Sequence, residues 1–365
     1  MADLAFGRHS LWFGSFQKWK SVLLKALCVL LGLLTVSGCA QPKGPVFPPL
    51  DKPIVWPGGE EQPRISYVGS LSSDRDLKPG QSFFESVGEA LFGKKSGYGM
   101  IAPYAVCTDG RDRVFVSDTG AHLIHVFNLK TRKYEQWKPE ADADLQMLQP
   151  VGLVYDSYNR LLVSDSVAGT IFAFDDNGRY LGHFGEDSLR RPCGITFDDK
   201  TQRILVVDSA YHQLIELAMD GELIRRVGRR GTGLGEFNFP THVTIDDSGR
   251  IYVSDSLNFR VQVFDSELKP IHQIGKKGDM PGYFSLPKGL AIDPEGHLYV
   301  LDAQFEAVEI FDERGRLLMS FGQEGHGPGE FWLPSDIFID DNNRIWITDS
   351  YNRRVQVFDF LMQVK

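Results

Sequence analysis

A motif of about 47 residues recurs along this chain of 365 residues, and the recurrence constrains the fold more than any other feature. Two copies are nearly identical, VSDSLNFRVQVFD at 253–265 and ITDSYNRRVQVFD at 347–359. The aspartate of the motif recurs with spacings of 47, 43, 47, 47 and 47 residues, at Asp118, Asp165, Asp208, Asp255, Asp302 and Asp349. The chain therefore contains six copies of one structural unit.

Each copy contains four short runs of β-branched or aromatic residues, such as HVTID, RIYVSD, RVQVFD and PIHQIG in the fourth copy. Gly, Asp, Asn or Pro bounds these runs, which is typical of strands separated by turns. Four-stranded units at this period are typical of β-propeller blades. Because one twisted sheet cannot bury both of its faces, the six units must pack around an axis. We expect an all-β, six-bladed propeller with four-stranded antiparallel blades.

Two copies, FNFPTHVTIDDSGRIYVSDSLNFRVQVFD and FWLPSDIFIDDNNRIWITDSYNRRVQVFD, resemble NHL repeats. The resemblance extends over residues 64–360 and weakens in the first three copies. It implies a propeller of the NHL type. That family includes scaffolds, RNA binders and lyases, so the fold alone does not determine the function.

The sixth copy ends in RVQVFDFLMQVK and lacks a fourth strand, whereas RISYVGSL (64–71) precedes the first copy. We expect this N-terminal strand to complete the last blade, which would leave no exposed sheet edge. An open ring with five complete blades is the alternative.

The first 38 residues resemble a bacterial lipoprotein signal peptide, in which basic residues precede the apolar run 26–36 and the lipobox-like VSGC at 36–39. This run is too short for a permanent membrane span. We expect cleavage before Cys39 and lipidation of Cys39, which would anchor the protein in the cell envelope. Ala40 favours the outer membrane. An ordinary signal peptide with a chance cysteine is the alternative.

Residues 39–63 contain seven prolines and predict an extended tether, followed by the propeller at 64–365. The tether would join the lipid anchor to the propeller. The chain carries a net charge of −9, and loss of a signal with four basic residues and one acidic residue would leave −12. We therefore expect no nucleic-acid partner.

An insert at 72–100 interrupts the repeat before the first blade. Its segment SFFESVGEALFG (82–93) predicts a short helix, with Ser82 and Glu85 as a capping box and Gly93 after its C-terminus. We expect the helix on the face that carries the connections between blades. It would pack on the blade edges, or act as a lid or a partner-docking helix.

The second residue after the blade-opening proline is Ala or Gly in four copies, but it is His242 and Asp336 in the other two. First strands line the channel of a propeller, so these side chains are expected at the channel mouth, near Lys288, Tyr104 and Cys193. They would bind a polar ligand or a cation there, or hydrogen-bond to a neighbouring loop. Whether a metal binds stays open.

Paired basic residues occupy the loops that lead into the third, fourth and fifth blades: Arg190 and Arg191, Arg229 and Arg230, Lys276 and Lys277. They would form an arc of cations on one face, suited to an acidic protein, a phosphorylated glycolipid or an anionic polymer. Plain solvation of these side chains is the alternative.

Other features favour structure over catalysis. The motif aspartates are kept apart by symmetry, and we expect them to stabilise turns. Cys107 aligns with a core valine, and Cys193 predicts a small buried residue more than a reactive thiol. The sequence has no GxSxG, HExxH or CxxC motif. No cofactor is expected.

Two enzyme families share features with this sequence. Peptidyl-hydroxyglycine lyases hold zinc with histidines from several blades, but here no histidine follows a blade-opening proline directly. Sugar lactonases bind a divalent cation with Glu, Asn and Asp, to which His242 and Asp336 are only partly similar.

The sequence thus predicts a lipid-anchored binding or scaffold protein of the envelope, monomeric or part of a hetero-complex. It would present one propeller face to an envelope protein or an anionic polymer. A cation-dependent hydrolase or lyase with its site at the channel mouth is the alternative. A purely structural member of an envelope complex is a third hypothesis.

Overall fold

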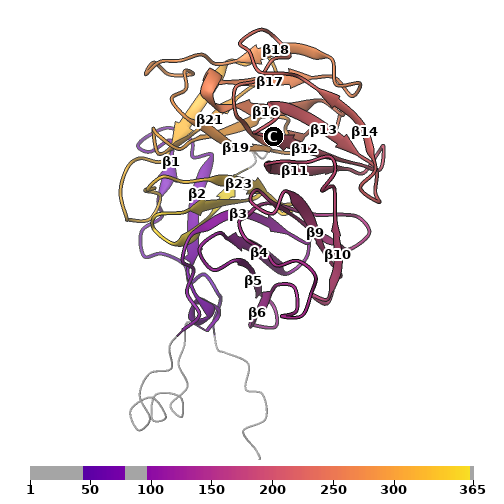
Figure 1. Cartoon of the computed structure of the whole chain (residues 1–365). Coiled ribbons are helices and arrows are strands. Elements are labelled where there is room, and N and C mark those ends of the chain that lie inside the picture. Colours follow the sequence, from indigo (N-terminus) through magenta and orange to yellow (C-terminus); the bar gives the residue numbers. More distant parts are fainter. Residues whose placement is uncertain (1–43, 79–96, 362–365) are drawn as a thin grey trace, which may run out of the picture. The chain divides into compact units, whose positions relative to one another are not determined.

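Each repeat folds into one antiparallel sheet in the computed structural model, which describes residues 44–78 and 97–361 (Figure 1). The first strand of each blade is innermost. Blade 1 contains β3 (Pro103–Thr108), β4 (Arg113–Asp118), β5 (Leu123–Asn128) and β6 (Lys133–Trp137), and blade 2 contains β7 (Pro150–Tyr155), β8 (Leu161–Asp165), β9 (Thr170–Phe174) and β10 (Tyr180–Phe184). Blade 3 contains β11 (Pro192–Asp198), β12 (Arg203–Asp208), β13 (Gln213–Leu217) and β14 (Leu223–Val227), and blade 4 contains β15 (Pro240–Ile245), β16 (Ile251–Asp255), β17 (Arg260–Phe264) and β18 (Pro270–Ile274). Blade 5 contains β19 (Pro287–Ile292), β20 (Leu298–Asp302), β21 (Ala307–Phe311) and β22 (Leu317–Phe321).

The sixth blade is closed by the N-terminal segment. It contains β23 (Asp336–Ile339), β24 (Arg344–Asp349) and β25 (Arg354–Phe360), and its next strand is β2 (Ile65–Leu71). The register pairs Tyr67 with Phe358 and Leu71 with Val355. The predicted closing strand is therefore confirmed.

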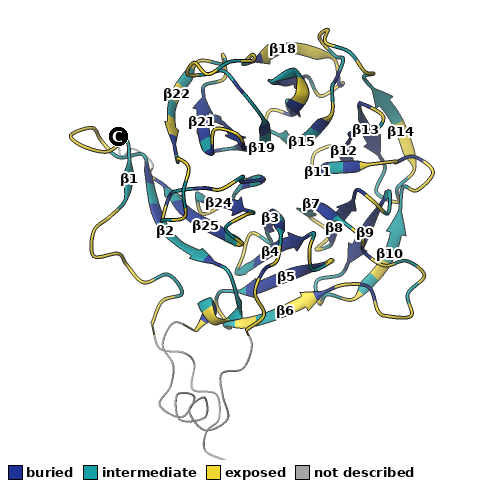
Figure 2. Ribbon diagram, turned by 60° about the vertical axis from the view of Figure 1, so that its left-hand side comes forward, coloured by how far each residue is buried: buried dark blue, intermediate teal, exposed yellow. Residues whose placement is uncertain are grey.

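The six blades form a closed ring around the innermost strands. Each innermost strand contacts those of both neighbouring blades, including β23 with β3 where the ring closes. In Figure 2 the innermost strands face the centre, while the outer strands β6, β10, β14 and β18 lie at the periphery. The predicted all-β, six-bladed architecture is confirmed.

Six apolar clusters hold the ring together, one between each pair of neighbouring blades. Because successive residues of a strand point to opposite faces of its sheet, each blade supplies side chains to both of its neighbours. Val106, for example, packs toward blade 6, whereas Cys107 packs toward blade 2. The prediction that Cys107 lies in the core is confirmed.

The described part of the predicted tether, residues 44–63, lies against the propeller instead of extending away from it. Val55–Trp56 forms β1, which pairs with β2 as a fifth strand of blade 6. The Trp56 ring lies 5.8 Å from those of Phe321 and Phe358, and the Phe47 ring lies 6.3 Å from Trp346. Proline content indicated an extended chain, but the half-buried aromatic side chains of Phe47 and Trp56 pack against blade 6.

Helical structure in the described residues is confined to two 3₁₀ turns, Asp74–Leu77 and Ser256–Asn258. The helix predicted at 82–93 lies outside the described residues, as do the signal peptide and Cys39. Within 44–78 and 97–361, no helix has the length and apolar character needed to cross a bilayer.

Candidate functional site at the channel mouth and the connection face

The loops of the propeller are divided between two faces. Neighbouring strands of a blade are antiparallel, so the turns between second and third strands share one face with the connections that lead to the next blade. We call this the connection face. The opposite face holds the turns between first and second strands and between third and fourth strands, and we call it the turn face.

The motif aspartates organise the connection face. The Asp118 carboxylate accepts hydrogen bonds of 2.6–2.9 Å from two backbone amides of the incoming connection and two of the following turn. Asp165, Asp208 and Asp302 accept the same kind of set. All six aspartates are fully buried. The predicted role in turns is confirmed.

Four of the five channel-mouth candidates lie close together at the start of the first strands. His242 Nε2 lies 3.8 Å from Asp336 Oδ1. The Tyr104 ring is nearly parallel to that of His242, with centroids 6.3 Å apart. Lys288 Nζ lies 5.8 Å from the centre of the Tyr104 ring. These residues come from blades 1, 4, 5 and 6, so the closed ring creates the cluster.

Glycines at the equivalent positions of neighbouring blades allow this approach. A β-carbon on Gly194 would lie 2.6 Å from the Cα of His242, and one on Gly289 would lie 2.8 Å from the Cα of Asp336. Such contacts are too short for any residue with a β-carbon. The pattern of small residues that first identified His242 and Asp336 therefore reflects how tightly the first strands pack.

Burial favours the neutral forms of these groups. It lowers the pKa of His242 to about 3, with the charge of Lys288 adding to the effect. Burial also raises the pKa of Asp336 to about 7, against the hydrogen bonds that its carboxylate accepts from the amides of Val106 and Ile337. The pKa of the Lys288 ammonium is lowered and that of the Tyr104 hydroxyl is raised, again mainly by burial.

Cys193 lies at the rim of this cluster. Its Sγ lies 3.5 Å from the Ser209 hydroxyl and 3.6 Å from the Arg191 carbonyl oxygen. Burial raises the pKa of the thiol, which disfavours the reactive thiolate. The interpretation of Cys193 as a small, largely buried residue fits this environment.

A cavity of about 100 Å³ lies in the channel. All six innermost strands contribute to its wall, through Val106, Leu153, Ile195, His242, Leu290 and Asp336 among others. Among the described residues, no group of three or more His, Cys, Asp or Glu side chains is placed to hold a metal ion. Of these residue types, His242, Asp336 and Cys107 line the cavity.

The six basic residues of the predicted arc are exposed and belong to loops of the connection face. Arg229 pairs with Glu236 at 2.8 Å. Lys276 Nζ lies 4.4 Å from the centre of the Tyr283 ring in its own loop, and Lys277 Nζ lies 4.9 Å from that of Phe259. The remaining three side chains, Arg190, Arg191 and Arg230, have no acidic partner within the described ranges.

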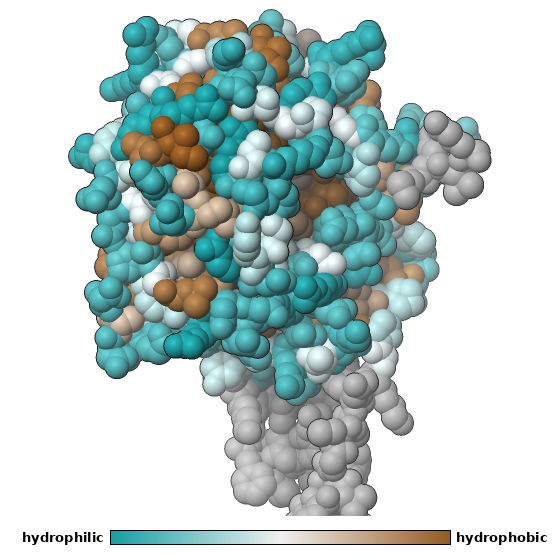
Figure 3. All heavy atoms as spheres, turned by 90° about the vertical axis from the view of Figure 1, so that its right-hand side faces the viewer, coloured by the Kyte–Doolittle hydropathy of each residue, from teal (hydrophilic) through white to brown (hydrophobic). Residues whose placement is uncertain are grey.

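Exposed apolar side chains on the same face were missed by the sequence reasoning. We call them the apolar ring; they are Ile101, Leu148, Val167, Tyr211, Leu234, Phe239, Leu257, Met280, Phe305, Trp332 and Tyr351, each 36–60% exposed. Figure 3 shows one side of the molecule, where apolar side chains gather in separate patches among hydrophilic ones. The sequence contained a signal for five of the eleven, because these five stand two or three residues after a motif aspartate, in a turn where polar residues are usual.

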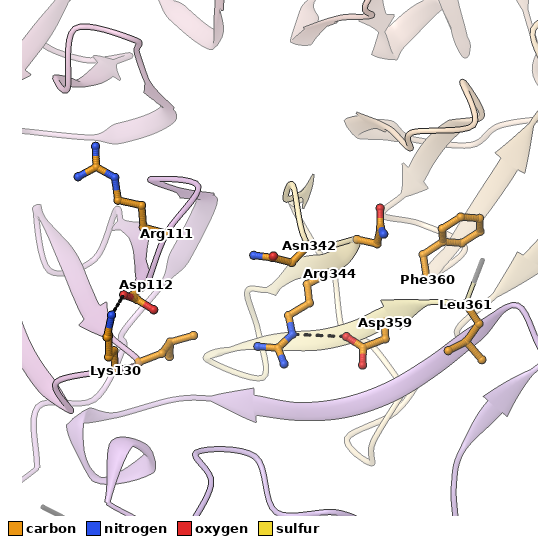
Figure 4. A pocket seen from close by; sticks show the side chains of 10 residues that line it. Arg111, Asp112, Lys130, Asn342, Arg344, Asp359, Phe360 and Leu361 are labelled. Atoms are coloured by element: carbon orange, nitrogen blue, oxygen red, sulfur yellow. Dashed lines mark ion pairs between the residues drawn. The ribbon is translucent and has the colours of Figure 1, made fainter. Parts of the chain in front are cut away.

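A second pocket lies on the turn face, between blades 1 and 6 (Figure 4). It measures about 610 Å³ and its lining is mainly polar. Each side of the pocket carries one ion pair, Lys130 with Asp112 at 3.5 Å on blade 1 and Arg344 with Asp359 at 3.4 Å on blade 6. Its charges are therefore largely neutralised within the pocket, which leaves little excess charge for a ligand.

Two family models match parts of the chain. One, described as a 6-bladed beta-propeller, matches residues 295–363, and one described as an NHL repeat matches residues 237–264. NHL repeat-containing protein 3 of Homo sapiens is 39% identical over 79 residues, 21% of this chain and 22% of that protein. Protein brain tumor of Drosophila melanogaster is 27% identical over 128 residues, 34% of this chain and 12% of that protein. The match thus spans less than a quarter of these relatives.

Solved structures share the architecture at low sequence identity. A streptogramin B lyase has a TM-score of 0.54 at 12% identity, over 72% of this chain and 94% of that one. An auxiliary nutrient binding protein from Bacteroides thetaiotaomicron VPI-5482 has a TM-score of 0.56 at 10% identity, over 72% and 70%. At these identities the likeness concerns the fold alone.

Proposed function

We propose that this NHL-type six-bladed β-propeller is a binding protein that docks an acidic envelope protein on its connection face, while lipid on Cys39 anchors it in the cell envelope. The observation that carries the proposal is that the apolar ring and the basic arc occupy the same face. Each feature alone is common on protein surfaces, but together they match the composition of a protein interface.

The apolar ring supplies the contact area. Trp332, Tyr351, Phe305 and Met280 are of the types enriched at interfaces, and Trp and Tyr are frequent among the residues that dominate binding energy. The backbone amides of Phe305 and Trp332 donate to the buried Asp302 and Asp349, and the amide of Tyr351 donates to the Trp332 carbonyl oxygen. A partner would therefore find these side chains already in place, which reduces the entropy lost on binding.

The basic arc favours a partner whose surface carries negative charge. On a chain of net charge −9, six exposed cations are concentrated on one face, and exposed Glu186, Asp187 and Asp279 in the same loops offset part of this charge. Such a patch speeds the approach of an acidic surface and opposes that of a basic one. An anionic polymer would use the arc but would have little use for the apolar ring.

A capture experiment tests this assignment. Detergent extracts of the source cell envelope are passed over the full chain, over a ring variant (Leu257→Ser, Phe305→Ser, Tyr351→Ser) and over an arc variant (Arg229, Arg230, Lys276 and Lys277→Ser). We expect one acidic protein to be retained by the full chain and lost by both variants. The matched control, Lys269→Ser with Arg314→Ser, removes exposed cations from the turn face of blades 4 and 5 and should retain it.

The outcomes separate the candidate partners. Retention of a polymer that depends on the arc and not on the ring would replace the protein partner by an anionic polymer. Equal losses in the arc variant and in the turn-face control would show that only net charge matters, and would remove the connection face from the proposal.

The anchor has its own test. Cys39→Ser should move the protein from the membrane fraction to the soluble fraction, because the lipid would be the only attachment. Ala40→Asp should move the lipidated protein from the outer to the inner membrane. Membrane retention of the Cys39→Ser protein would contradict lipid anchoring at this residue.

A further inference from the structure

The channel mouth contains polar groups that the docking face does not use. His242 is 7% exposed, and its Nδ1 is buried without a hydrogen-bond partner in the described structure. A buried polar atom of this kind destabilises the protein when nothing bonds to it. The imidazole lines the channel cavity, so its free nitrogen is a candidate contact for a molecule inside.

A cation lies beside it without a counter-charge. Lys288 is half-buried, and within residues 44–78 and 97–361 it has neither an ion pair nor a side-chain hydrogen bond; its only charge contact is with the Tyr104 ring. Its charge reaches His242, where it contributes to the lowered pKa. A partly desolvated ammonium without a partner favours an anionic ligand over a cationic one.

The cavity limits the size and shape of that anion. Its volume of about 100 Å³ exceeds the space that one water needs, about 10–15 Å³, and is smaller than a 150 Å³ cavity that holds benzene. Its wall carries Leu153, Ile195 and Leu290 besides His242 and Asp336. Lys288 lies outside this lining, beside the Tyr104 ring. A ligand of about six non-hydrogen atoms, with one charged end and a short apolar chain, fits these features.

We propose that the channel binds a small aliphatic monocarboxylate, with its carboxylate at His242 and Asp336, where the charge of Lys288 reaches from the mouth, and its chain against Leu153 and Leu290. This site is separate from the docking proposed above and does not depend on it. Lys288 supplies the charge, His242 Nδ1 supplies a hydrogen bond in its Nδ1–H tautomer, and Asp336 donates a hydrogen bond while it is protonated.

Protonation of Asp336 then controls affinity. Its pKa of about 7 means that the carboxyl is a donor below neutral pH and a second negative charge above it. The titratable groups next to it are those of His242, Tyr104 and Cys107, and beyond them lie Lys288, beside His242, and Cys193, beside Tyr104. The pKa shifts of Tyr104, Cys107 and Cys193 keep these three neutral as pH rises through 7. Ionisation of Asp336, and any loss of charge from Lys288, whose pKa burial lowers, both weaken the binding of an anion as pH rises.

Calorimetry on the full chain in a nonionic detergent tests the proposal, with butyrate as the probe. At about pH 6, butyrate should bind at one site per chain, and neutral butyramide and cationic butylamine about tenfold more weakly or not at all. Lys288→Met should weaken butyrate binding about tenfold. The control Lys277→Met removes an exposed cation from the connection face and should leave binding unchanged.

A second measurement keeps the test independent of how the variants fold. For the unaltered chain, butyrate affinity should fall severalfold between about pH 6 and pH 8 as Asp336 ionises. Equal affinity for butyrate and butyramide, affinity that does not change with pH, or no saturable binding would each overturn the proposal. Partner capture by the connection face should persist in Lys288→Met, which distinguishes failure of this site from failure of the docking function.

Discussion

The two faces of the propeller use their charges in opposite ways. On the turn face, the first residue of a turn is an aspartate that contacts an arginine or histidine four residues later, in Asp109–Arg113, Asp156–Arg160, Asp246–Arg250, Asp293–His297 and Asp312–Arg316. On the connection face, Arg229 is the only residue of the basic arc with an acidic partner in the described structure. These five turn aspartates are therefore each paired with a neighbouring side chain, whereas five of the six arc residues have no acidic partner in the described structure.

This difference separates folding from recognition. The carboxylate of Asp246 also accepts hydrogen bonds from the backbone amides of Ser248 and Arg250, so the same group fixes the turn and pairs with the cation. Apart from Arg229, which donates a hydrogen bond to Glu236 in the same loop, the arc residues make no side-chain hydrogen bond in the described structure. Substitutions of the paired turn residues should therefore change stability, and substitutions of the arc and the apolar ring should change binding.

The largest effect is expected where the ring closes, because neither face exists without it. A chain that begins at Ser72 loses β2 and with it the burial of Ile65, Tyr67 and Leu71. Each such side chain contributes about 1.5–3 kcal/mol, so the loss approaches the whole stability of a typical domain, about 5–15 kcal/mol. We expect the cooperative thermal unfolding transition, followed by circular dichroism, to disappear. A chain that begins at Gln62 is the control and should retain it.

The second prediction compares two neighbouring residues of the connection face. Asp255 is buried, and its carboxylate accepts hydrogen bonds from the Asn238 amide at 2.6 Å and Arg260 Nε at 2.9 Å. Asp255→Ala would leave Arg260 buried without its carboxylate and should cost about 3–5 kcal/mol in urea unfolding. Leu257→Ser, two residues later, should change stability by less than about 0.5 kcal/mol while weakening partner binding.

Either of two results would contradict this distinction between Asp255 and Leu257. Should Leu257→Ser destabilise the fold as strongly as Asp255→Ala, the apolar ring would be part of the core and not a binding surface. Should Asp255→Ala remain stable, the motif aspartates would not hold the turns.

The sequence was enough to predict the closed ring of six blades, because repeated strands, turns and apolar positions all indicated the same architecture. It also identified His242 and Asp336, because departures from Gly in a repeat are visible without a structure. It could not show that Tyr104 stacks on His242, since these residues are 138 positions apart and meet only when blades 1 and 4 face each other across the channel.

The errors have a similar origin. The prolines of 39–63 indicated an extended tether, but Phe47 and Trp56 pack on blade 6, which no local pattern could reveal. The apolar ring was missed because each of its residues is a single exposed side chain in the sequence. Only the closed ring places them on one face.

The third prediction concerns how the titration of Asp336 and His242 at the channel mouth makes stability depend on pH. Between pH 3.8, the usual pKa of an aspartate, and about 7, the native state keeps a proton on Asp336 that the unfolded chain has lost, so stability falls as pH rises. Between about 3 and 6.5, the unfolded chain binds a proton that His242 in the native state does not, so stability rises with pH. The two slopes oppose each other from about pH 4 to 6.5.

Removing either group should reveal the slope of the other. Asp336→Asn should become more stable as pH rises through this window, by up to about 1.4 kcal/mol per pH unit relative to the unaltered chain, and His242→Gln should become less stable. Urea unfolding at several pH values measures both. Parallel profiles for the two variants would mean that these side chains are solvated, and that the channel mouth is an ordinary part of the surface.

The smallest expected effect is a difference in stability cost between substitutions of two arginines, one on each face of the propeller. Arg250 Nε lies 2.8 Å from Asp246 Oδ2; although burial alone would raise the pKa of Asp246, hydrogen bonds from Ser248 and Arg250 lower it. Arg250→Gln should therefore cost about 0.5–1 kcal/mol at neutral pH, and the cost should vanish as acid protonates Asp246. Arg230→Gln should cost less than about 0.5 kcal/mol at any pH, because its side chain has no acidic partner in the described structure. Equal costs for the two substitutions would mean that the cations of both faces serve the fold alike, and the connection face would then have no surplus charge to offer a partner.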